Sequence, residues 1–239
     1  MPNIIGINHV CISSKNILVD SKKFEKLGYK MSFSENQLKI VKEKRQFILS
    51  NNEFHDLIFL KSQSHISIEL INHHDFTGHK NENYNVILDI SKLNHTDFED
   101  VKKDPICQLL ENEFKFKFFK KMDKKISFSF YGQKNSKFNE NIIIISNSDI
   151  DKSSKFWCTL FGFNEIKSGI NNYINYKILE FNAPIKKWSI KIIIISKKIL
   201  NQKKYLNDFG CTCISFIVTS IEDFLKNNEK FEFFSNSKP

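Results

Sequence analysis

The sequence is poor in the residues that shape many binding loops: it has seven glycines, four prolines, one alanine and one arginine among 239 residues. Its glycines form neither a G-x-x-x-x-G-K-[ST] loop nor a G-x-G-x-x-G turn, so the sequence gives no sign of a nucleotide site. The G-x-S-x-G and H-E-x-x-H motifs of serine hydrolases and zinc proteases are also missing. These common enzyme classes therefore have no support in the sequence.

The cysteine pattern suits no disulfide framework. The count of five is odd, and a single residue separates Cys211 from Cys213, which matches neither a C-x-x-C redox pair nor a zinc knuckle. We therefore expect reduced thiols in a cytoplasmic protein. The five are Cys11, Cys107, Cys158, Cys211 and Cys213.

Long apolar runs are also missing. The isoleucine runs at 142–145 and 192–195 have the length of strands, well short of the ~20 residues of a membrane helix. The first ten residues lack the charged start and apolar stretch of a signal peptide. The formal charge of +9 comes almost entirely from lysines scattered among acidic residues, whereas specific nucleic-acid binders favour arginine. We therefore expect neither a membrane nor a nucleic acid as partner.

What the sequence does have is a repeated pattern. Two stretches, "HVCISSKNILVDSKKFEKLGYK" from His9 and "IIIISNSDIDKSSKFWCTLFGFNE" from Ile142, each read as a strand, a polar break, a helix and an apolar-Gly-aromatic end. The glycine suits a helix C-terminus because it enters the left-handed conformation without steric cost. Further strand patterns follow at 65–71 and 188–195. The spacing predicts units of βαβββ type.

Two more starts occur at Asn85, in "NVILDISKLNHTDFEDV", and at Cys213, in "CISFIVTSIEDFLKNN". We expect βαβββ units at 1–75 and 138–197, a less regular unit at 82–135, and an incomplete unit at 208–239. Residues 1–135 would then form a first module pair and residues 136–239 a second region. Pairing of the first unit with the third is the alternative. A second copy of the chain could complete the last unit, which would give a homodimer.

These pieces resemble the vicinal oxygen chelate superfamily, which includes glyoxalases, extradiol dioxygenases and bleomycin-resistance proteins. The resemblance rests on "INHVCIS", "KKFEKLGYK", "ISIEL", "SSKFWCTLFGFNE" and "CISFIVTSIEDFL". It implies an α+β fold in which tandem βαβββ modules form curved mixed sheets, a glyoxalase-like cup, with helices outside. In this superfamily the first and last strands of a module each offer one residue to the cup, and together these residues can hold a divalent metal.

The resemblance implies that His9 and Glu69 are metal ligands. His9 matches the first-strand position, and Glu69 matches the last-strand position in "IEL". An imidazole and a carboxylate suit zinc, iron, manganese or nickel. Glu69 would also be catalytic, because it could move a proton between two substrate carbons.

The matching positions of the later units carry no usual ligand. The first-strand position falls on Asn85, Ile142 and Cys213, and the last-strand position falls on Ser129 and Lys191. Two side chains alone hold a metal weakly, so further donors would be needed. The weaker candidates are His73, His74 and Cys213, and other histidines that come into question are His55, His65 and His79.

Two functions are consistent with these residues. The first is a metal-dependent enzyme of glyoxalase, isomerase or lyase type that acts on a small oxygenated metabolite. The second is a metal-free small-molecule binding or resistance-type protein without catalysis. An extradiol dioxygenase is disfavoured because its set of two histidines and one carboxylate is not visible.

Overall fold

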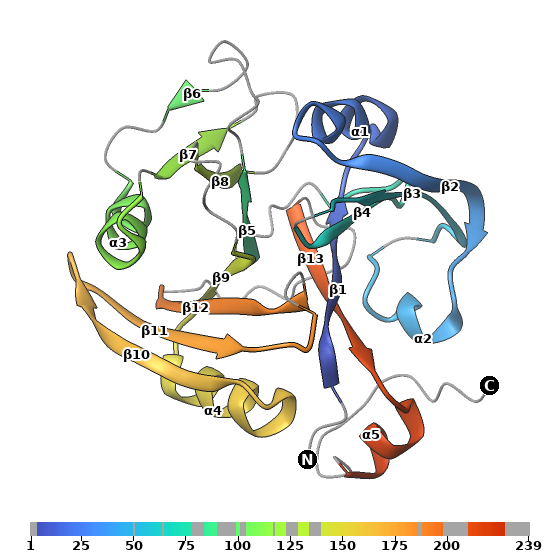
Figure 1. Ribbon diagram of the computed structural model, residues 1–239. Coiled ribbons are helices and arrows are strands. Elements are labelled where there is room, and N and C mark those ends of the chain that lie inside the picture. Colours follow the sequence, from blue (N-terminus) through green and yellow to red (C-terminus); the bar gives the residue numbers. More distant parts are fainter. Residues whose placement is uncertain are drawn as a thin grey trace.

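The computed structural model describes residues 4–49, 51–63, 65–77, 84–89, 99–100, 104–116, 118–122, 129–133, 140–185, 188–197 and 210–227 (Figure 1). These residues form two mixed β-sheets with helices packed against them, which confirms the expected α+β class. None of the helices in these ranges is long and apolar enough to cross a bilayer.

The first unit has the expected βαβββ arrangement with one short extra helix. Its strands lie in the order β1-β4-β3-β2, and β1 runs parallel to β4. The Asn16 side chain accepts a hydrogen bond from the backbone N–H of Val19 and so caps the first helix, and Gly28 ends that helix at φ 91°. The elements are β1 (Ile4–Ser13), α1 (Ile17–Lys26), β2 (Lys30–Lys39), α2 (Lys42–Arg45), β3 (Phe54–Lys61) and β4 (Ser67–Asn72).

The third unit has the same strand order, β9-β12-β11-β10. Asp149 caps its helix through a 2.9 Å hydrogen bond from the backbone N–H of Lys152, and Gly162 ends it at φ 71°. Left-handed glycines after both helices confirm the sequence prediction. The elements are β9 (Ile142–Asn147), α4 (Ile150–Phe161), β10 (Asn164–Asn171), β11 (Ile174–Phe181) and β12 (Ile190–Ser196).

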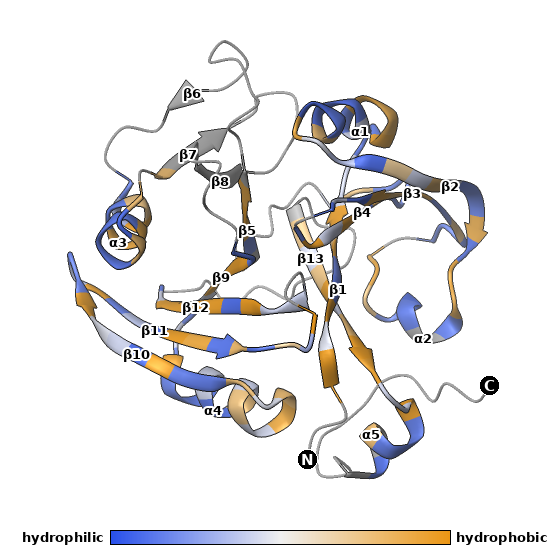
Figure 2. Ribbon diagram, in the orientation of Figure 1, coloured by the Kyte–Doolittle hydropathy of each residue, from blue (hydrophilic) through white to orange (hydrophobic). Residues whose placement is uncertain are grey.

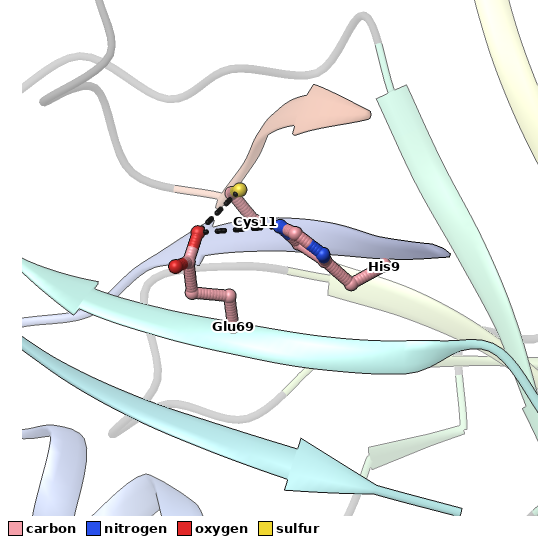
Figure 3. Close-up of side chains that lie close together, drawn as sticks. All are labelled: His9, Cys11 and Glu69. Atoms are coloured by element: carbon pink, nitrogen blue, oxygen red, sulfur yellow. Dashed lines mark hydrogen bonds and ion pairs between the residues drawn. The ribbon is translucent and has the colours of Figure 1, made fainter. Parts of the chain in front are cut away.

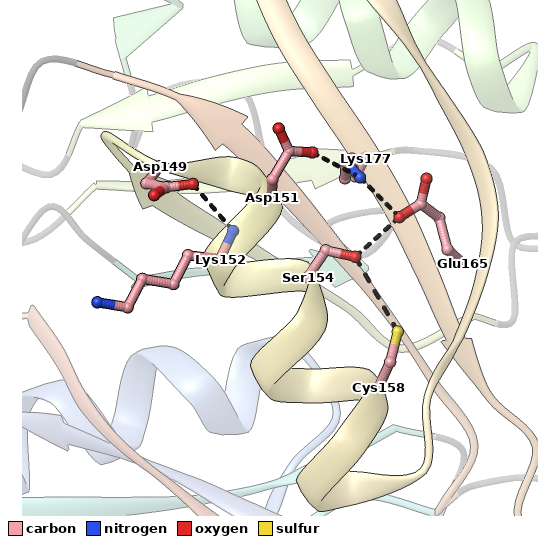
Figure 4. Close-up of polar contacts among 7 residues, drawn as sticks. All are labelled: Asp149, Asp151, Lys152, Ser154, Cys158, Glu165 and Lys177. Atoms are coloured by element: carbon pink, nitrogen blue, oxygen red, sulfur yellow. Dashed lines mark hydrogen bonds and ion pairs between the residues drawn. The ribbon is translucent and has the colours of Figure 1, made fainter.

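A polar cluster holds α4 against the outer face of this unit (Figure 4). The Lys177 amino group on β11 lies 2.8 Å from Asp151 Oδ1 and 2.9 Å from Glu165 Oε2. The Ser154 hydroxyl donates to the same Glu165 oxygen at 2.8 Å. The cluster therefore links α4 to both β10 and β11.

The second unit departs from the βαβββ order. Its strands lie in the order β5-β8-β7-β6, but the outermost strand, β6, comes before the helix in the chain. Its last strand is described from Ser129 to Gln133, and residues 124–128 of the expected strand 124–130 lie outside the described residues. The elements are β5 (Tyr84–Asp89), β6 (Glu99–Asp100), α3 (Pro105–Phe114), β7 (Phe118–Met122) and β8 (Ser129–Gln133).

The units join through antiparallel pairs of their first strands. The incomplete last unit, with β13 (Gly210–Val218) and α5 (Ile221–Asn227), pairs β13 with β1, and β5 pairs with β9. The first unit is thus joined to the last, and the second to the third, which differs from both groupings expected from the sequence. A local strand pattern carries no information about such distant partners. The boundary near residue 135 and the homodimer stay predictions.

Strands β9 and β12 are buried on both faces. Ile143, Ile145, Ile192 and Ile194 pack in one cluster with Trp157 of α4. The alternate residues pack in a second cluster with Leu109 and Leu110 of α3, and they are Ile142, Ile144, Ile193 and Ile195. Helices α4 and α3 therefore lie on opposite faces of this sheet (Figure 1).

Helices α1 and α4 lie outside the sheets as expected, and α3 packs through Leu109 and Leu110 against the inner isoleucines of the third unit. Because the isoleucine runs are continuous, both faces of the strands are apolar and each can bury a helix. Figure 2 shows this pattern, with β9 hydrophobic along much of its length and α3 hydrophobic on only part of its surface. The inner face of the third unit is therefore part of the protein core.

Candidate metal centre

Strands β1 and β4 alternate between apolar and polar side chains, unlike β9 and β12. Val10 and Ile12 on β1, and Ile68 and Leu70 on β4, are buried in the main core with α1. The residues between them face the other way, with Cys11 directly beside Glu69 in the parallel ladder. The alternation therefore places His9, Cys11 and Glu69 on one face of the first sheet.

The three side chains converge (Figure 3). Cys11 Sγ donates a hydrogen bond to Glu69 Oε2 at 2.8 Å, and His9 Nε2 lies 3.5 Å from the same oxygen. One ligand atom from each residue lies within 4.8 Å of the other two. We call this set the three-donor cluster.

The cluster is largely shielded from solvent. The side chains of His9 and Glu69 are 15% and 18% exposed, and Cys11 is buried. Burial raises the pKa of Glu69, but hydrogen bonds with His9 and Cys11 outweigh this effect and leave that pKa below its ordinary value. A hydrogen bond with Cys213, followed by burial, raises the pKa of Cys11. At neutral pH Glu69 is therefore a carboxylate, and Cys11 is a thiol that donates to it.

The imidazole of His9 packs against aromatic rings, and its Nδ1 atom makes no hydrogen bond with the described residues. Its ring packs edge-on against Phe59, with centroids 5.2 Å apart, and Phe33 stacks on Phe59 at the same distance. Among the described residues, the buried Nδ1 of His9 has no hydrogen-bond partner. The other ring nitrogen, Nε2, is the one that points toward Glu69 and belongs to the three-donor cluster.

The structure brings together the two residues that the resemblance implied, His9 and Glu69, and adds Cys11. The weaker candidate Cys213 lies opposite Cys11 on β13 and is exposed, outside the three-donor cluster. Its hydrogen bond with Cys11 lowers the pKa of Cys213 to about 7. Metal binding by these residues stays a prediction.

The remaining histidine candidates lie apart from the cluster. His73 follows β4 and faces the ring of His55, with centroids 5.7 Å apart. His74 Nε2 lies 3.3 Å from Asp56 Oδ2. His65 is in the turn before β4, and His79 is outside the described residues.

Sequence analysis missed Cys11 as a donor. It was treated only as one of five reduced thiols, although it lies two residues after His9 in a strand. Two-residue spacing puts side chains on the same face, so the signal was present in "HVC".

The matching positions in the third unit are isoleucines. Aligning the two units on their helix caps, Asn16 and Asp149, matches His9 with Ile142 and Cys11 with Ile144. In the ladder, Ile144 lies beside Ile193 as Cys11 lies beside Glu69. Each donor of the cluster is therefore replaced by an isoleucine on the face that α3 covers.

This register corrects the position expected for Lys191. Lys191 lies beside Ile142, so it matches Ser67 and not Glu69. Its amino group lies 2.7 Å from Glu140 Oε2 and 3.5 Å from Glu180 Oε1. The sequence alignment was two residues out of register because the isoleucine run offers no landmark.

The other two expected positions, Asn85 and Ser129, lie on β5 and β8 of the second unit. Asn85 pairs with Ile144 across β5 and β9, just as Cys213 pairs with Cys11 across β13 and β1. Ser129 begins β8, and its side chain lies outside the described part of the structure.

Comparison with known proteins identifies the fold. No family model and no curated protein matches the sequence. Glyoxalase I from Zea mays is similar in structure, with a TM-score of 0.58 and 9% identity over 92% of this chain and 77% of that enzyme. A mutant of the same enzyme gives a TM-score of 0.59 and 10% identity over 94% of this chain and 78% of its own. The chain therefore has the fold of glyoxalase I.

Proposed function

We propose that the three-donor cluster binds one divalent transition-metal ion, and that the chain is a glyoxalase-type lyase or isomerase for a small metabolite with two neighbouring oxygen atoms. The observation that supports this proposal is the convergence of an imidazole, a thiol and a carboxylate from β1 and β4 at one point. The resemblance to the superfamily assigns a metal to the same place in the cup.

The donor set favours some metals over others. Thiolates prefer soft ions such as zinc, imidazole suits zinc, iron and nickel, and an all-oxygen site would suit manganese or magnesium. Cys11 therefore shifts the expectation from manganese toward zinc. Binding would release the thiol proton of Cys11, because the thiolate is the form that ligates metals.

The bound ion would supply Lewis-acid polarisation of a substrate oxygen. The residues of the chain would do the rest. Glu69, ionised at neutral pH, would accept a proton from one substrate carbon at Oε1 and return it to the neighbouring carbon. Phe59 and Phe33 form an apolar wall beside His9, which would exclude water from one side of the substrate.

A second candidate is a metal-free small-molecule binding protein. The observation that favours it is that all three donors come from one unit, while the matching residues of the third unit are isoleucines. In this case the cup would bind its ligand through the aromatic wall and the Glu69 carboxylate alone.

Metal content separates the two candidates. Tag-free protein, purified without chelators and dialysed against metal-free buffer, is compared with His9→Ala, Glu69→Ala and Cys11→Ser. The proposal predicts about one tightly held ion per chain in the parent and loss of that ion in the variants. His74→Ala, whose histidine is paired with Asp56, is the matched control and should keep the ion.

Cobalt(II) substitution and a substrate screen then test the details. A thiolate-to-cobalt charge-transfer absorption should be present in the parent and missing in Cys11→Ser. Hemithioacetals and α-hydroxyketones are suitable first substrates because both offer two neighbouring oxygens, and Glu69→Gln should abolish their turnover. Absence of any ion, with the variants folded, would contradict the metalloenzyme and favour the binding protein.

A further inference from the structure

A second group of histidines lies on the same face of the first sheet, farther along β3 and β4. In this antiparallel pair Phe59 lies opposite Glu69, Leu57 opposite Ile71 and Asp56 opposite Asn72. Continued by one residue, the ladder places His55 opposite His73, and their ring centroids are 5.7 Å apart. The apolar pair of Leu57 and Ile71 separates these rings from Glu69.

Both rings carry a buried nitrogen that is not satisfied. Among the described residues, the Nδ1 atoms of His55 and His73 have no hydrogen-bond partner. The whole of His73 is only 4% exposed. Buried polar atoms are nearly always hydrogen-bonded in folded proteins, so two such atoms on facing rings need an explanation.

His74 shows that an ordinary structural histidine at this end of the sheet is paired. Its Nε2 lies 3.3 Å from Asp56 Oδ2. For His73, one residue earlier, the described residues give no ion pair with a carboxylate, and its ring lies beside another imidazole. The unsatisfied nitrogens therefore belong to the facing pair and are not a general property of this segment.

The spacing of the rings suits one shared ion. Two imidazoles on a tetrahedral metal, with metal–nitrogen bonds of about 2.0–2.1 Å, place their ring centres about 5 Å apart. The observed 5.7 Å, with the ring planes 56° apart, is close to this value. Burial lowers the pKa of His73 to about 4 and also lowers that of His55, so both rings are neutral at pH 7, as metal ligands must be.

We propose that His55 and His73 form a second metal site, which binds a divalent transition metal of the kind that imidazole prefers, such as zinc, nickel or copper. Two protein donors leave coordination positions free for water or for an oxygen of a small anion. This site is weaker than the three-donor cluster, because it offers fewer ligands and no thiolate. The proposal does not depend on the function proposed for that cluster.

Zinc and nickel binding to chelator-stripped protein, followed by isothermal titration calorimetry, tests the proposal. The Glu69→Ala variant removes the first site, so its remaining binding reports on the second. In this background we expect binding that His55→Ala and His73→Ala each weaken at least tenfold, while His74→Ala leaves it unchanged. A Glu69→Ala protein that binds neither ion would overturn the proposal, as would equal losses in His55→Ala and His74→Ala.

A second experiment uses the parent protein and therefore does not depend on the folding of the His73→Ala variant. Diethyl pyrocarbonate modifies free imidazoles, and peptide mass spectrometry gives the extent at each histidine. Nickel should protect His55, which is only partly buried, and leave His74 unprotected, whereas equal modification of His55 with and without nickel would contradict the site. If the three-donor cluster bound no ion, the calorimetric and the modification results expected for His55 and His73 would be unchanged. The two metal-site proposals can therefore fail independently.

Discussion

The inner faces of the first and third units occupy matching positions in the same fold, yet one is polar and the other is core. In the first unit His9, Cys11 and Glu69 meet on one polar face of the sheet, and Lys44 of the short helix α2 lies near enough to help lower the pKa of Glu69. In the third unit Ile142, Ile144 and Ile193 take their places, and α3 packs on them through Leu109 and Leu110. The inner face of the first unit therefore carries polar side chains that could bind a ligand. The matching face of the third unit is apolar and buried in the protein core.

The difference between the polar and the buried inner face is visible in the strand sequences. A strand with one buried face alternates between apolar and polar residues, as in "HVCIS" and "SIELI", whereas a strand buried on both faces is apolar throughout, as in "IIIIS". Each unit also keeps its outer helix, α1 or α4, on the face away from the cup. The comparison predicts that substitutions on the inner faces have opposite effects in the two units.

Exchanging the side chains of Glu69 and Ile193, which occupy matching positions, should give the largest difference in stability between the two units. Ile193→Glu buries an unpaired carboxylate beneath α3, and we expect a loss of about 3–5 kcal/mol in the free energy of unfolding, or no folding at all. Glu69→Ile should leave the protein folded and remove the proposed metal. Urea denaturation followed by circular dichroism measures both. A folded Ile193→Glu protein of parental stability would contradict the filled cup.

Truncation to alanine should show the same contrast at a second matched position. Ile144→Ala leaves a cavity in a packed core, and we expect it to lower the free energy of unfolding by about 2–5 kcal/mol. Cys11→Ala removes a small side chain and one hydrogen bond to Glu69, and the expected cost is about 1 kcal/mol. If both variants lost the same free energy of unfolding in chelator-treated protein, the two faces would be packed alike, contrary to this account.

The pH dependence of stability should come from the polar face. His73 has a folded-state pKa of about 4, below the ordinary 6.5, so the unfolded state binds its proton first as the pH falls. The folded protein should therefore lose stability between pH 6.5 and pH 4, by up to about 3 kcal/mol. His73→Phe should flatten this part of the profile in metal-free protein. A profile equal to that of the parent would contradict burial of a neutral His73.

The outer helices should respond alike, because α1 and α4 both pack into the same core cluster. Asn16→Ala and Asp149→Ala each remove an N-cap hydrogen bond, from α1 and from α4. We expect a loss of about 1 kcal/mol in each, measured by thermal unfolding. A much larger loss in one variant would show that the units differ on the helix side as well.

Much of this fold could be predicted from local patterns. The alternation around His9 and Glu69, the caps at Asn16 and Asp149, and the left-handed Gly28 and Gly162 all lie within a few residues of the elements they define. One feature was out of reach. The pairing of β1 with β13 joins residues about two hundred positions apart, and nothing local specifies it.

The candidate site was predicted in part. His9 and Glu69 followed from the resemblance, while Cys11 was missed although its two-residue spacing from His9 placed it on the same face. The inward position of α3 was also missed, because its amphipathic pattern is the same on either side of a sheet. The continuous isoleucines of β9 and β12 were the available sign that a second helix covers them.

The central proposal is that the three-donor cluster on the polar face of the first unit holds a metal, whereas the matching isoleucine face of the third unit holds none. The most direct measurement is anomalous X-ray diffraction at the zinc edge from a crystal of the zinc-loaded protein. The account predicts a strong peak between His9 Nε2, Cys11 Sγ and Glu69 Oε2, and none beside Ile142, Ile144 and Ile193. Absence of a peak at the three-donor cluster in a fully soaked crystal would contradict it.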